Sequence, residues 1–386
     1  MATTILVSGV QYSGIWNISS QANAKGAGTW PVPPTYALFT WGKNDFGQLG
    51  LGNTTYRSSP NQVGTLSWDS IGATQNSSVA VKSGTLWAWG KNNNGQLGLG
   101  NTTYYSSPKQ VGALTNWSSA SGGQEWCIAI KTDGTLWSWG GGSYGALGLG
   151  NTSSYSSPKQ IGSLTTWASF STGGRFVLAI QTNGTLWAWG DNANGTLGLG
   201  NLTNYSSPKQ IGALTAWSKT FVNNSAFSAF ALKTDGTLWS WGLNQFGSLG
   251  LGNLTYYSSP KQIGALTNWS ANSSGLGYGL AAVKTDGTLW TWGYNASGTL
   301  GLGNTTNYSS PKQVGALTTW YLASANFFSA YAIKTDGTLW SWGNNASGQL
   351  GLGNTTYYSS PKQIGTATTW QKITGTLYSA TAIRIT

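Results

Sequence analysis

The residues that could carry acid–base or nucleophilic chemistry are few and scattered. The chain has no histidine, and Cys127 is its single cysteine. Four of the eight carboxylates repeat at equivalent positions and four stand alone: Asp133, Asp235, Asp286 and Asp336, then Asp45, Asp69, Glu125 and Asp191. Histidine is the commonest general base and metal ligand, so no Ser-His-Asp, Cys-His or metal cluster can be assembled. The four lone carboxylates lie in different units and show no paired spacing. We therefore expect no enzyme, no catalytic residue, no metal site and no cofactor.

A net charge of +11 makes a polyanionic partner worth considering. Six lysines follow a proline at equivalent positions, and Asn61 takes the seventh place: Lys109, Lys159, Lys209, Lys261, Lys312 and Lys362. A ring of lysines could bind phosphates, but lysine beside proline is also a usual device against edge-to-edge pairing of an outer strand. We favour the outer-strand interpretation and do not expect nucleic-acid binding.

One column of residues varies although the copies around it are nearly identical. It holds Asn76, Glu125, Arg175, Phe227, Tyr278, Phe328 and Tyr378. A ring of mixed aromatic and charged side chains is typical of a recognition surface, and drift in a tolerant loop is the alternative. Because the neighbouring Asn-Thr-Thr-x-Tyr loops stay nearly constant, we hypothesise that the seven residues form a recognition face around a channel mouth.

The elements that would position these residues come from a repeat of the chain. A Trp-Gly pair recurs with spacings of 48, 50, 50, 52, 51 and 50 residues, at Trp41, Trp89, Trp139, Trp189, Trp241, Trp292 and Trp342. In one unit, residues 127–130 predict a short apolar strand, which we take as the inner strand of the blade. Residues 136–139 alternate large apolar with small polar side chains, which predicts a second strand. Further strands begin at Gln160 and Trp167. Four short strands per unit, with no helical period, predict propeller blades.

Two details of the unit carry structural expectations. Asp133-Gly134 between the first two strands predicts a two-residue hairpin turn with positive φ. The paired tryptophans of each unit, such as Trp137 and Trp139, predict core packing between blades, because each indole can bury roughly 150–250 Å².

Closure of the ring follows from the two ends of the repeat. Residues 36–42 match the strand after the Asp-Gly turn, and residues 370–386 supply the half-unit that would precede it. The sequence therefore predicts an all-β, seven-bladed propeller of four-stranded blades over residues 35–386, closed by N- and C-terminal strands that share one blade.

The unit T-D-G-x-L-W-S-W-G-x-N-x-x-G-Q-L-G-L-G, followed by P-x-Q-I, resembles the regulator of chromosome condensation repeat, a family of seven-bladed propellers. The resemblance implies functions that range from guanine-nucleotide exchange on a small GTPase, with chromatin binding, to scaffolds, adhesins and inhibitors. Two departures count against exchange. The family's usual histidine is replaced by Ser77, Trp126, Phe176, Ser228, Gly279, Ser329 and Ser379, and the uniform spacings leave no room for a protruding insertion.

Residues 1–34 fall outside the repeat and form a predicted leader. Aromatic residues at Tyr12, Trp16 and Trp30 stand among small residues, and a Pro-Val-Pro-Pro segment follows. This segment resembles leaders on bacteriophage tail and surface proteins, so we expect it to attach the propeller to other virion proteins. A plug packed under the ring is the alternative.

Together these patterns predict a non-catalytic virion-surface protein, a tail or capsid decoration whose variable residues contact a host-surface glycan or protein. The alternative is a cytoplasmic scaffold or chromatin- or GTPase-binding regulator, and a glycan-binding lectin is a weaker one. Membrane insertion is not expected, because no apolar run approaches the roughly 18 residues that a span requires.

Overall fold

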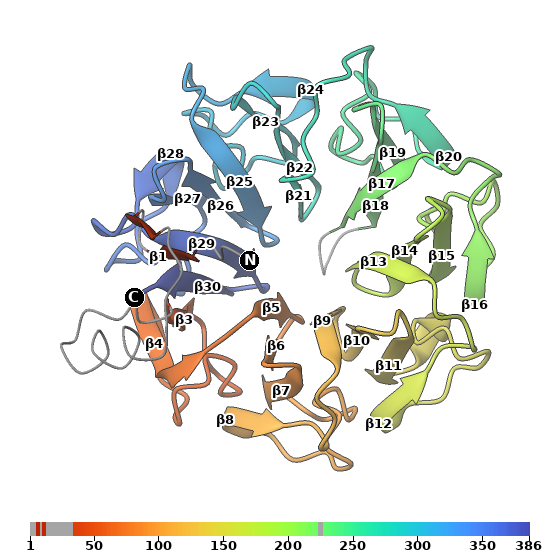
Figure 1. The fold of residues 1–386 in the computed structure, drawn as a ribbon. Coiled ribbons are helices and arrows are strands. Elements are labelled where there is room, and N and C mark those ends of the chain that lie inside the picture. Colours follow the sequence, from red (N-terminus) through yellow and green to blue (C-terminus); the bar gives the residue numbers. More distant parts are fainter. Residues whose placement is uncertain (1–4, 8–9, 13–33, 223–226) are drawn as a thin grey trace.

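The computed structural model describes residues 5–7, 10–12, 34–222 and 227–386. Seven four-stranded antiparallel sheets stand around a central axis as the blades of a propeller (Figure 1). The predicted all-β, seven-bladed architecture is confirmed. Two further strands, β1 (Ile5–Val7) and β2 (Val10–Tyr12), pair with each other in a sheet of their own.

Each blade is a meander that runs from the central channel to the rim. The innermost strands are β5 (Ser70–Ala73), β9 (Trp117–Gly122), β13 (Trp167–Thr172), β17 (Trp217–Phe221), β21 (Ser274–Leu276), β25 (Trp320–Ala325) and β29 (Trp370–Gly375). The second strands are β6 (Ser77–Lys82), β10 (Trp126–Lys131), β14 (Phe176–Gln181), β18 (Ser228–Lys233), β22 (Gly279–Val283), β26 (Ser329–Lys334) and β30 (Ser379–Ile385). The strand that contains Cys127 is therefore second from the channel, and our assignment of it as the inner strand was wrong.

The outer half of each blade begins with the Trp-Gly strand. The third strands are β7 (Thr85–Gly90), β11 (Leu136–Gly140), β15 (Leu186–Gly190), β19 (Leu238–Gly242), β23 (Leu289–Gly293), β27 (Leu339–Gly343) and β3 (Tyr36–Gly42). The rim strands are β8 (Tyr105–Gln110), β12 (Tyr155–Gln160), β16 (Tyr205–Gln210), β20 (Tyr257–Gln262), β24 (Tyr308–Gln313), β28 (Tyr358–Gln363) and β4 (Arg57–Ser67). The six lysines after proline lie on these rim strands, each near a tyrosine ring of its own strand, as Lys109 Nζ does at 5.4 Å from the Tyr105 centroid.

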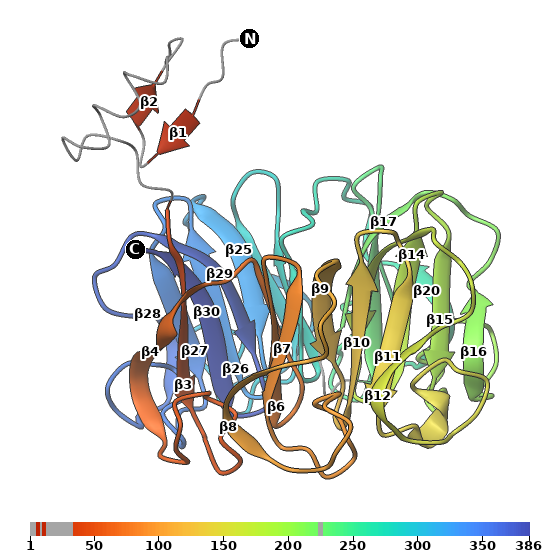
Figure 2. The same cartoon turned by 60° about the horizontal axis from the view of Figure 1, so that its bottom comes forward.

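The ring closes where the two ends of the repeat meet in one blade. Strand β3 pairs antiparallel with β30 over seven residue pairs, from Tyr36 with Ile385 to Gly42 with Ser379. Next to the Tyr36–Ile385 pair, Thr386 N–H donates to the Thr35 carbonyl at 3.0 Å. The start of β3 and the C-terminus thus lie on the same side of the ring (Figure 2). The predicted sharing of one blade by both ends is confirmed.

The turn between the second and third strands has two forms. In the first blade Ser83 and Gly84 both have positive φ (47° and 73°), and Lys82 pairs directly with Thr85, which is the expected two-residue turn. In the Asp-Gly copies only the glycine is left-handed, as at Gly134 (φ 76°). There Lys131 N–H donates to the Thr135 carbonyl at 3.0 Å, so the turn spans residues 132–134 and is longer than predicted. The aspartate accepts hydrogen bonds from the threonine two residues on.

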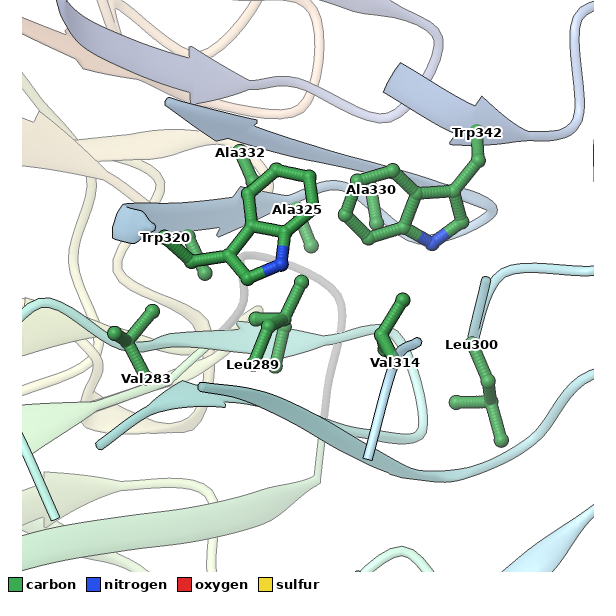
Figure 3. Close-up of a cluster of buried hydrophobic side chains, with 11 residues drawn as sticks. Val283, Leu289, Leu300, Val314, Trp320, Ala325, Ala330, Ala332 and Trp342 are labelled. Carbon is green, nitrogen blue, oxygen red and sulfur yellow. The ribbon is translucent and has the colours of Figure 1, made fainter. Parts of the chain in front are cut away.

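The hydrophobic core lies between the blades. Figure 3 shows one such interface, in which Val283, Leu289 and Val314 face the indoles of Trp320 and Trp342 on the next blade. Small alanines on β25 and β26 leave room for these rings. The same pattern recurs around the ring because every blade presents one aliphatic and one indole-bearing face.

Six of the seven third strands carry two tryptophans, and β3 carries Phe39 and Trp41. The two tryptophans of a strand have different environments. Trp139 is fully buried, and its Nε1–H donates across the interface to the Gln96 carbonyl at 2.9 Å. Trp137 is half-buried, with the Lys131 ammonium 3.9 Å from its ring centroid. Packing between blades is therefore confirmed for the tryptophan that precedes glycine. Its partner packs against the edge of the same cluster and also forms a cation–π contact.

The Asp-Gly turns make stability depend on pH in acid. Asp133 Oδ1 accepts hydrogen bonds from the Thr135 backbone (2.9 Å) and hydroxyl (2.6 Å), and such bonds lower the pKa of the carboxyl in four blades. A carboxyl with a lowered pKa stabilises the fold above its unfolded pKa, and this contribution is lost as the pH falls through the folded value. We expect the melting temperature to fall below about pH 4.

Replacing the four turn aspartates with asparagine should flatten this acid dependence. Asn183 already makes the same two hydrogen bonds, to the Thr185 backbone (3.1 Å) and hydroxyl (2.7 Å), so the turn itself is retained. Thermal unfolding of both proteins between pH 7 and pH 2 measures the effect. Equal pH slopes in the two proteins would contradict the assignment.

Candidate binding face

The seven variable residues occupy equivalent turns between the innermost and second strands. In each blade the carbonyl of this residue accepts the N–H of the residue after Trp-Gly, as Tyr378 does from Lys43 (2.9 Å) and Asn76 from Lys91 (3.1 Å). The structure thus brings all seven to one side of the ring, which we call the variable face. All seven are half-buried. They share this backbone hydrogen bond, whereas their side chains differ from blade to blade.

Aromatic rings from four neighbouring blades cluster on the variable face. We call this cluster the aromatic patch, and it consists of Phe246, Tyr278, Tyr294, Phe327, Phe328 and Tyr378. The Tyr278 ring lies 5.3 Å from Phe246, 6.1 Å from Tyr294 and 5.0 Å from Phe327, centroid to centroid.

Phe328 continues the patch toward the closing blade. Its ring centroid lies 4.4 Å from that of Phe327, and the ring is stacked against Tyr378 at 5.9 Å. The Lys43 ammonium lies 5.3 Å from the Tyr378 ring. Burial, with a smaller contribution from Tyr294, raises the pKa of Tyr278, so its phenol stays neutral at physiological pH. The half-buried rings provide apolar area with hydroxyl groups at the edge, as protein interfaces commonly do.

Sequence reasoning found half of the aromatic patch. The variable column supplied Tyr278, Phe328 and Tyr378, but Phe246, Tyr294 and Phe327 were missed. Tyr294 directly follows a Trp-Gly pair, and its backbone N–H is paired with the Tyr278 carbonyl. A second column taken at that position would have identified it.

Apart from Phe227, the other members of the variable column are polar or charged. Glu125 accepts hydrogen bonds from Lys91 Nζ (3.3 Å) and Asn94 Nδ2 (2.7 Å) of the preceding blade. Arg175 contacts Gln124 and Tyr144. Asn76 and Phe227, the remaining members of the column, are placed half-buried at their turns.

The central channel holds an open cavity of about 200 Å³ that the sequence did not indicate. Hydroxyl groups of the innermost strands line it, among them Ser171 Oγ, which donates to Thr220 Oγ1 at 2.8 Å. Lys219 also lines it and remains exposed to solvent. Desolvation by the surrounding residues of the channel lowers the pKa of its ammonium group. These residues were missed because the innermost strand had been assigned wrongly.

The predicted attachment residues cannot be placed against the ring. Trp16 and Trp30 lie outside the described residues, and of Tyr12 only the backbone, at the end of β2, is described. The leader over residues 1–34 stays a prediction.

Neither a reactive thiol nor a group of metal-binding side chains is found among the described residues. Cys127 is buried in an interface between blades, and burial raises the pKa of its thiol. No cluster of three or more His, Cys, Asp or Glu residues that could hold a metal occurs within the residues the structure describes. Among those same residues no helix has the length and apolar character of a membrane span.

The positions where the family's histidine was expected serve other roles. Ser228 Oγ donates to the Leu243 carbonyl (2.7 Å), Ser329 Oγ to the Asn344 carbonyl (2.7 Å), and Trp126 Nε1 to the Gly174 carbonyl (3.1 Å). These groups tie the turns of the variable face to neighbouring loops.

A family model described as the regulator of chromosome condensation (RCC1) repeat matches seven consecutive segments, which together cover most of the chain: residues 37–81, 83–130, 133–180, 183–222, 235–281, 286–325 and 336–376. The chain belongs to this family. The segments are offset from the blades by two strands, so each RCC1 repeat supplies the two outer strands of one propeller blade and inner strands of the next.

Curated relatives share short stretches of RCC1 repeats with the chain. Protein RCC2 of Mus musculus is 36% identical over 99 residues, 25% of this chain and 19% of the mouse protein. The ultraviolet-B receptor UVR8 of Arabidopsis thaliana is 36% identical over 80 residues, 20% of this chain and 18% of the plant protein. The matched segments thus span about a fifth of the length of these relatives.

Solved structures of RCC1-like propellers share the fold of the whole ring. Human WBSCR16 superposes with a TM-score of 0.80 at 18% identity and covers 91% of this chain and 99% of its own. Prp20p of Saccharomyces cerevisiae does so with a TM-score of 0.80 at 17% identity, over 92% of each chain.

These matches correct the functional expectation. The prediction of a virion-surface attachment protein, with virion proteins as partners through residues 1–34, is wrong, because the relatives are RCC1-type proteins. They fit the alternative of a scaffold or regulator. The matches likewise do not support a bacteriophage origin or a location in the virion.

Proposed function

We propose that this chain is a non-catalytic, intracellular binding propeller, a scaffold or regulator of the RCC1 type, and that the variable face contacts its partner protein. The aromatic patch is the observation that carries the proposal. Six half-buried rings gather where otherwise near-identical repeats differ. Aromatic side chains dominate binding energy at protein interfaces.

The relatives support a protein partner. Prp20p is described with binding properties toward Gsp1p and histones, and a second structure describes yeast RCC1 (Prp20) bound to Kap60. For this chain the net charge of +11 favours an acidic partner over a basic one such as a histone. We therefore propose an acidic protein partner of the GTPase class.

Removing two rings of the patch should remove partner binding. The Tyr278→Ala, Phe328→Ala double variant loses the stacked and edge-to-face contacts of the patch, and we expect affinity to fall about 30-fold or more, as for truncated hot spots of ~2 kcal/mol. Affinity purification from cells of the source organism, with quantitative mass spectrometry, would identify proteins that the wild type retains and the variant loses. Purified partner then gives the affinity by calorimetry.

A matched control removes apolar area from the opposite side of the ring. Leu114 and Leu317, 49% and 47% exposed, lie in the loops that enter β9 and β25 at the ends away from the variable face. A Leu114→Ala, Leu317→Ala variant should bind as the wild type does. Equal retention by both double variants would refute the variable face as the contact surface, and faster nucleotide release from an added GTPase would refute the non-catalytic assignment.

A further inference from the structure

Arg175 is held in one orientation at the junction of two blades. It lies in the turn between β13 and β14, and its Nε–H donates to Gln124 Oε1 of the preceding blade at 3.2 Å. Its guanidinium carbon lies 4.6 Å from the centroid of the Tyr144 ring. One nitrogen and one face of the guanidinium are therefore used for positioning.

The two turns that carry Arg175 and Gln124 are themselves tied together. The carbonyl of Gly174 accepts the backbone N–H of Gln124 at 3.0 Å and the Trp126 Nε1–H at 3.1 Å. The site is thus built on backbone that is anchored from both blades, which reduces the ordering cost of binding.

Tyr144 lies in a loop that lacks the asparagine found at the equivalent position of the other blades. In most blades the second residue after Trp-Gly is an asparagine that holds the following loop. Asn92 does so through its Nδ2, which donates to the carbonyls of Asn101 and Thr103 at 3.0 Å each. Gly142 replaces this asparagine here, and the loop forms the short 3₁₀ turn η1 (Ser143–Gly145).

Within η1 the backbone of Tyr144 is left-handed, with φ at 61°, and 42% of the residue is exposed. The left-handed conformation is strained for a residue other than glycine, and such strained residues cluster at functional sites. The strained residue is the one that supports the Arg175 guanidinium.

Arg175 has no anionic partner in the described chain. The two ion pairs among the described residues are Lys43 with Asp45 (2.8 Å) and Lys91 with Glu125 (3.3 Å). Nearby, the Asp191 carboxylate accepts the Ala193 N–H at 3.1 Å. Within residues 34–222 and 227–386, no protein group bonds to the two terminal nitrogens of Arg175.

We propose that Arg175, positioned by Gln124 and Tyr144, is the receptor for an aspartate or glutamate carboxylate of the partner protein. The inference rests on the proposed function and names the chemistry that one part of the variable face recognises. The two terminal nitrogens, which bond to no protein group in the described part of the chain, match the two oxygens of a carboxylate in the bidentate geometry that arginine favours. A monoanionic carboxylate suits a single guanidinium, whereas phosphorylated motifs are typically bound by clusters of arginines.

The arginine content of the chain gives a direct test. Only three arginines are present, Arg57, Arg175 and Arg384. Arg384 lies over the Phe39 ring at 4.5 Å, and Arg57 lies on the rim strand β4. The ¹⁵Nε–¹H resonances of full-length protein can therefore be followed during titration with a capped Gly-Glu-Glu-Gly peptide. We expect a saturable shift for Arg175 only, and no shift with the Gly-Gln-Gln-Gly peptide.

Variants separate the positioned guanidinium from net charge. Arg175→Lys keeps the charge but loses the planar pair of guanidinium nitrogens, so we expect the peptide to bind at least about tenfold more weakly. Tyr144→Gly keeps the left-handed backbone and removes the ring, and binding should weaken severalfold. Arg57→Gln removes one charge on the rim and should leave binding unchanged. Melting temperatures of all variants verify folding.

Three results would overturn the proposal. They are an Arg175 resonance that does not move, a shift shared equally with Arg57, and tighter binding of a matched phosphoserine peptide than of the glutamate peptide. These outcomes are distinct from failure of the proposed function. If the Tyr278→Ala, Phe328→Ala variant still loses its partner, the variable face stands and only the carboxylate receptor is lost.

Discussion

Replacing Trp139 with alanine should remove about 3–5 kcal/mol of unfolding free energy, the usual loss for a buried tryptophan. Its indole is fully buried between two blades among residues such as Val79 and Leu97, and its Nε1–H is bonded to the Gln96 carbonyl at 2.9 Å. The variant leaves a cavity and an unpaired buried carbonyl, each of which destabilises the fold. Since folded proteins are stable by only about 5–15 kcal/mol, we expect a large fall in melting temperature.

Trp137 is the matched control for this experiment, because it lies two residues away on the same strand. It is half-buried, and its Nε1–H donates to Thr135 Oγ1 at 2.9 Å within the same blade. Trp137→Ala should cost only about 1–2 kcal/mol. Trp139→Phe retains most of the buried volume and serves if the alanine variant does not fold. Thermal and urea unfolding measure all three, and equal losses at the two tryptophans would contradict the interface assignment.

Replacing Gly98 with alanine should destabilise the same interface from the opposite blade. Gly98 has a φ of +73°, and an added Cβ would lie 2.8 Å from Trp139 Nε1. The left-handed backbone costs alanine about 1–2 kcal/mol, and overpacking of a rigid core adds about 1–3 kcal/mol. The indole cannot move away, because it is enclosed by both blades. We therefore expect a loss of about 2–5 kcal/mol.

Gly112→Ala separates the backbone contribution to this loss from the steric contribution. Its φ of +62° is similar, but nothing lies within 4 Å of an added Cβ. Gly112→Ala should therefore show the backbone cost alone, about 1–2 kcal/mol. The difference between the two alanine variants, measured by denaturant unfolding, gives the steric contribution of close packing between blades. If the two variants lose the same stability, the approach of Gly98 to Trp139 is not a constraint on the fold.

The blades and their closure were predictable because their causes are local and repeated. The alternation at Leu136–Trp139 and the turn glycine at Gly134 act within a few residues, and seven copies reinforce one interpretation. The matching half-units at the two ends predicted the pairing of β3 with β30. The order of strands from channel to rim was not predictable in this way. Period-2 alternation shows that a strand has one buried face, but not which neighbour covers it.

The binding face was predictable only in part. Variation among copies located the turn residues, since equivalent positions in a closed ring share one side. The aromatic patch also needs Phe246 and Tyr294, which follow third strands, and Phe327, one residue before the column. Contacts between these rings join neighbouring blades, and no spacing in the sequence records them. The virion interpretation failed because it depended on the leader, which lies outside the repeat that identifies the family.

The sequence by itself determined the repeat, the number of blades, the shared closing blade and the residues in which the copies differ. These are consequences of short-range periodicity and turn chemistry. The tertiary structure alone decided that Trp139 and not Trp137 is fully buried between the blades, that hydroxyls and Lys219 line the channel, and that Gln124 and Tyr144 orient Arg175. Such contacts arise when the ring closes and brings together residues tens of positions apart, so their geometry depends on packing between blades rather than on any single segment.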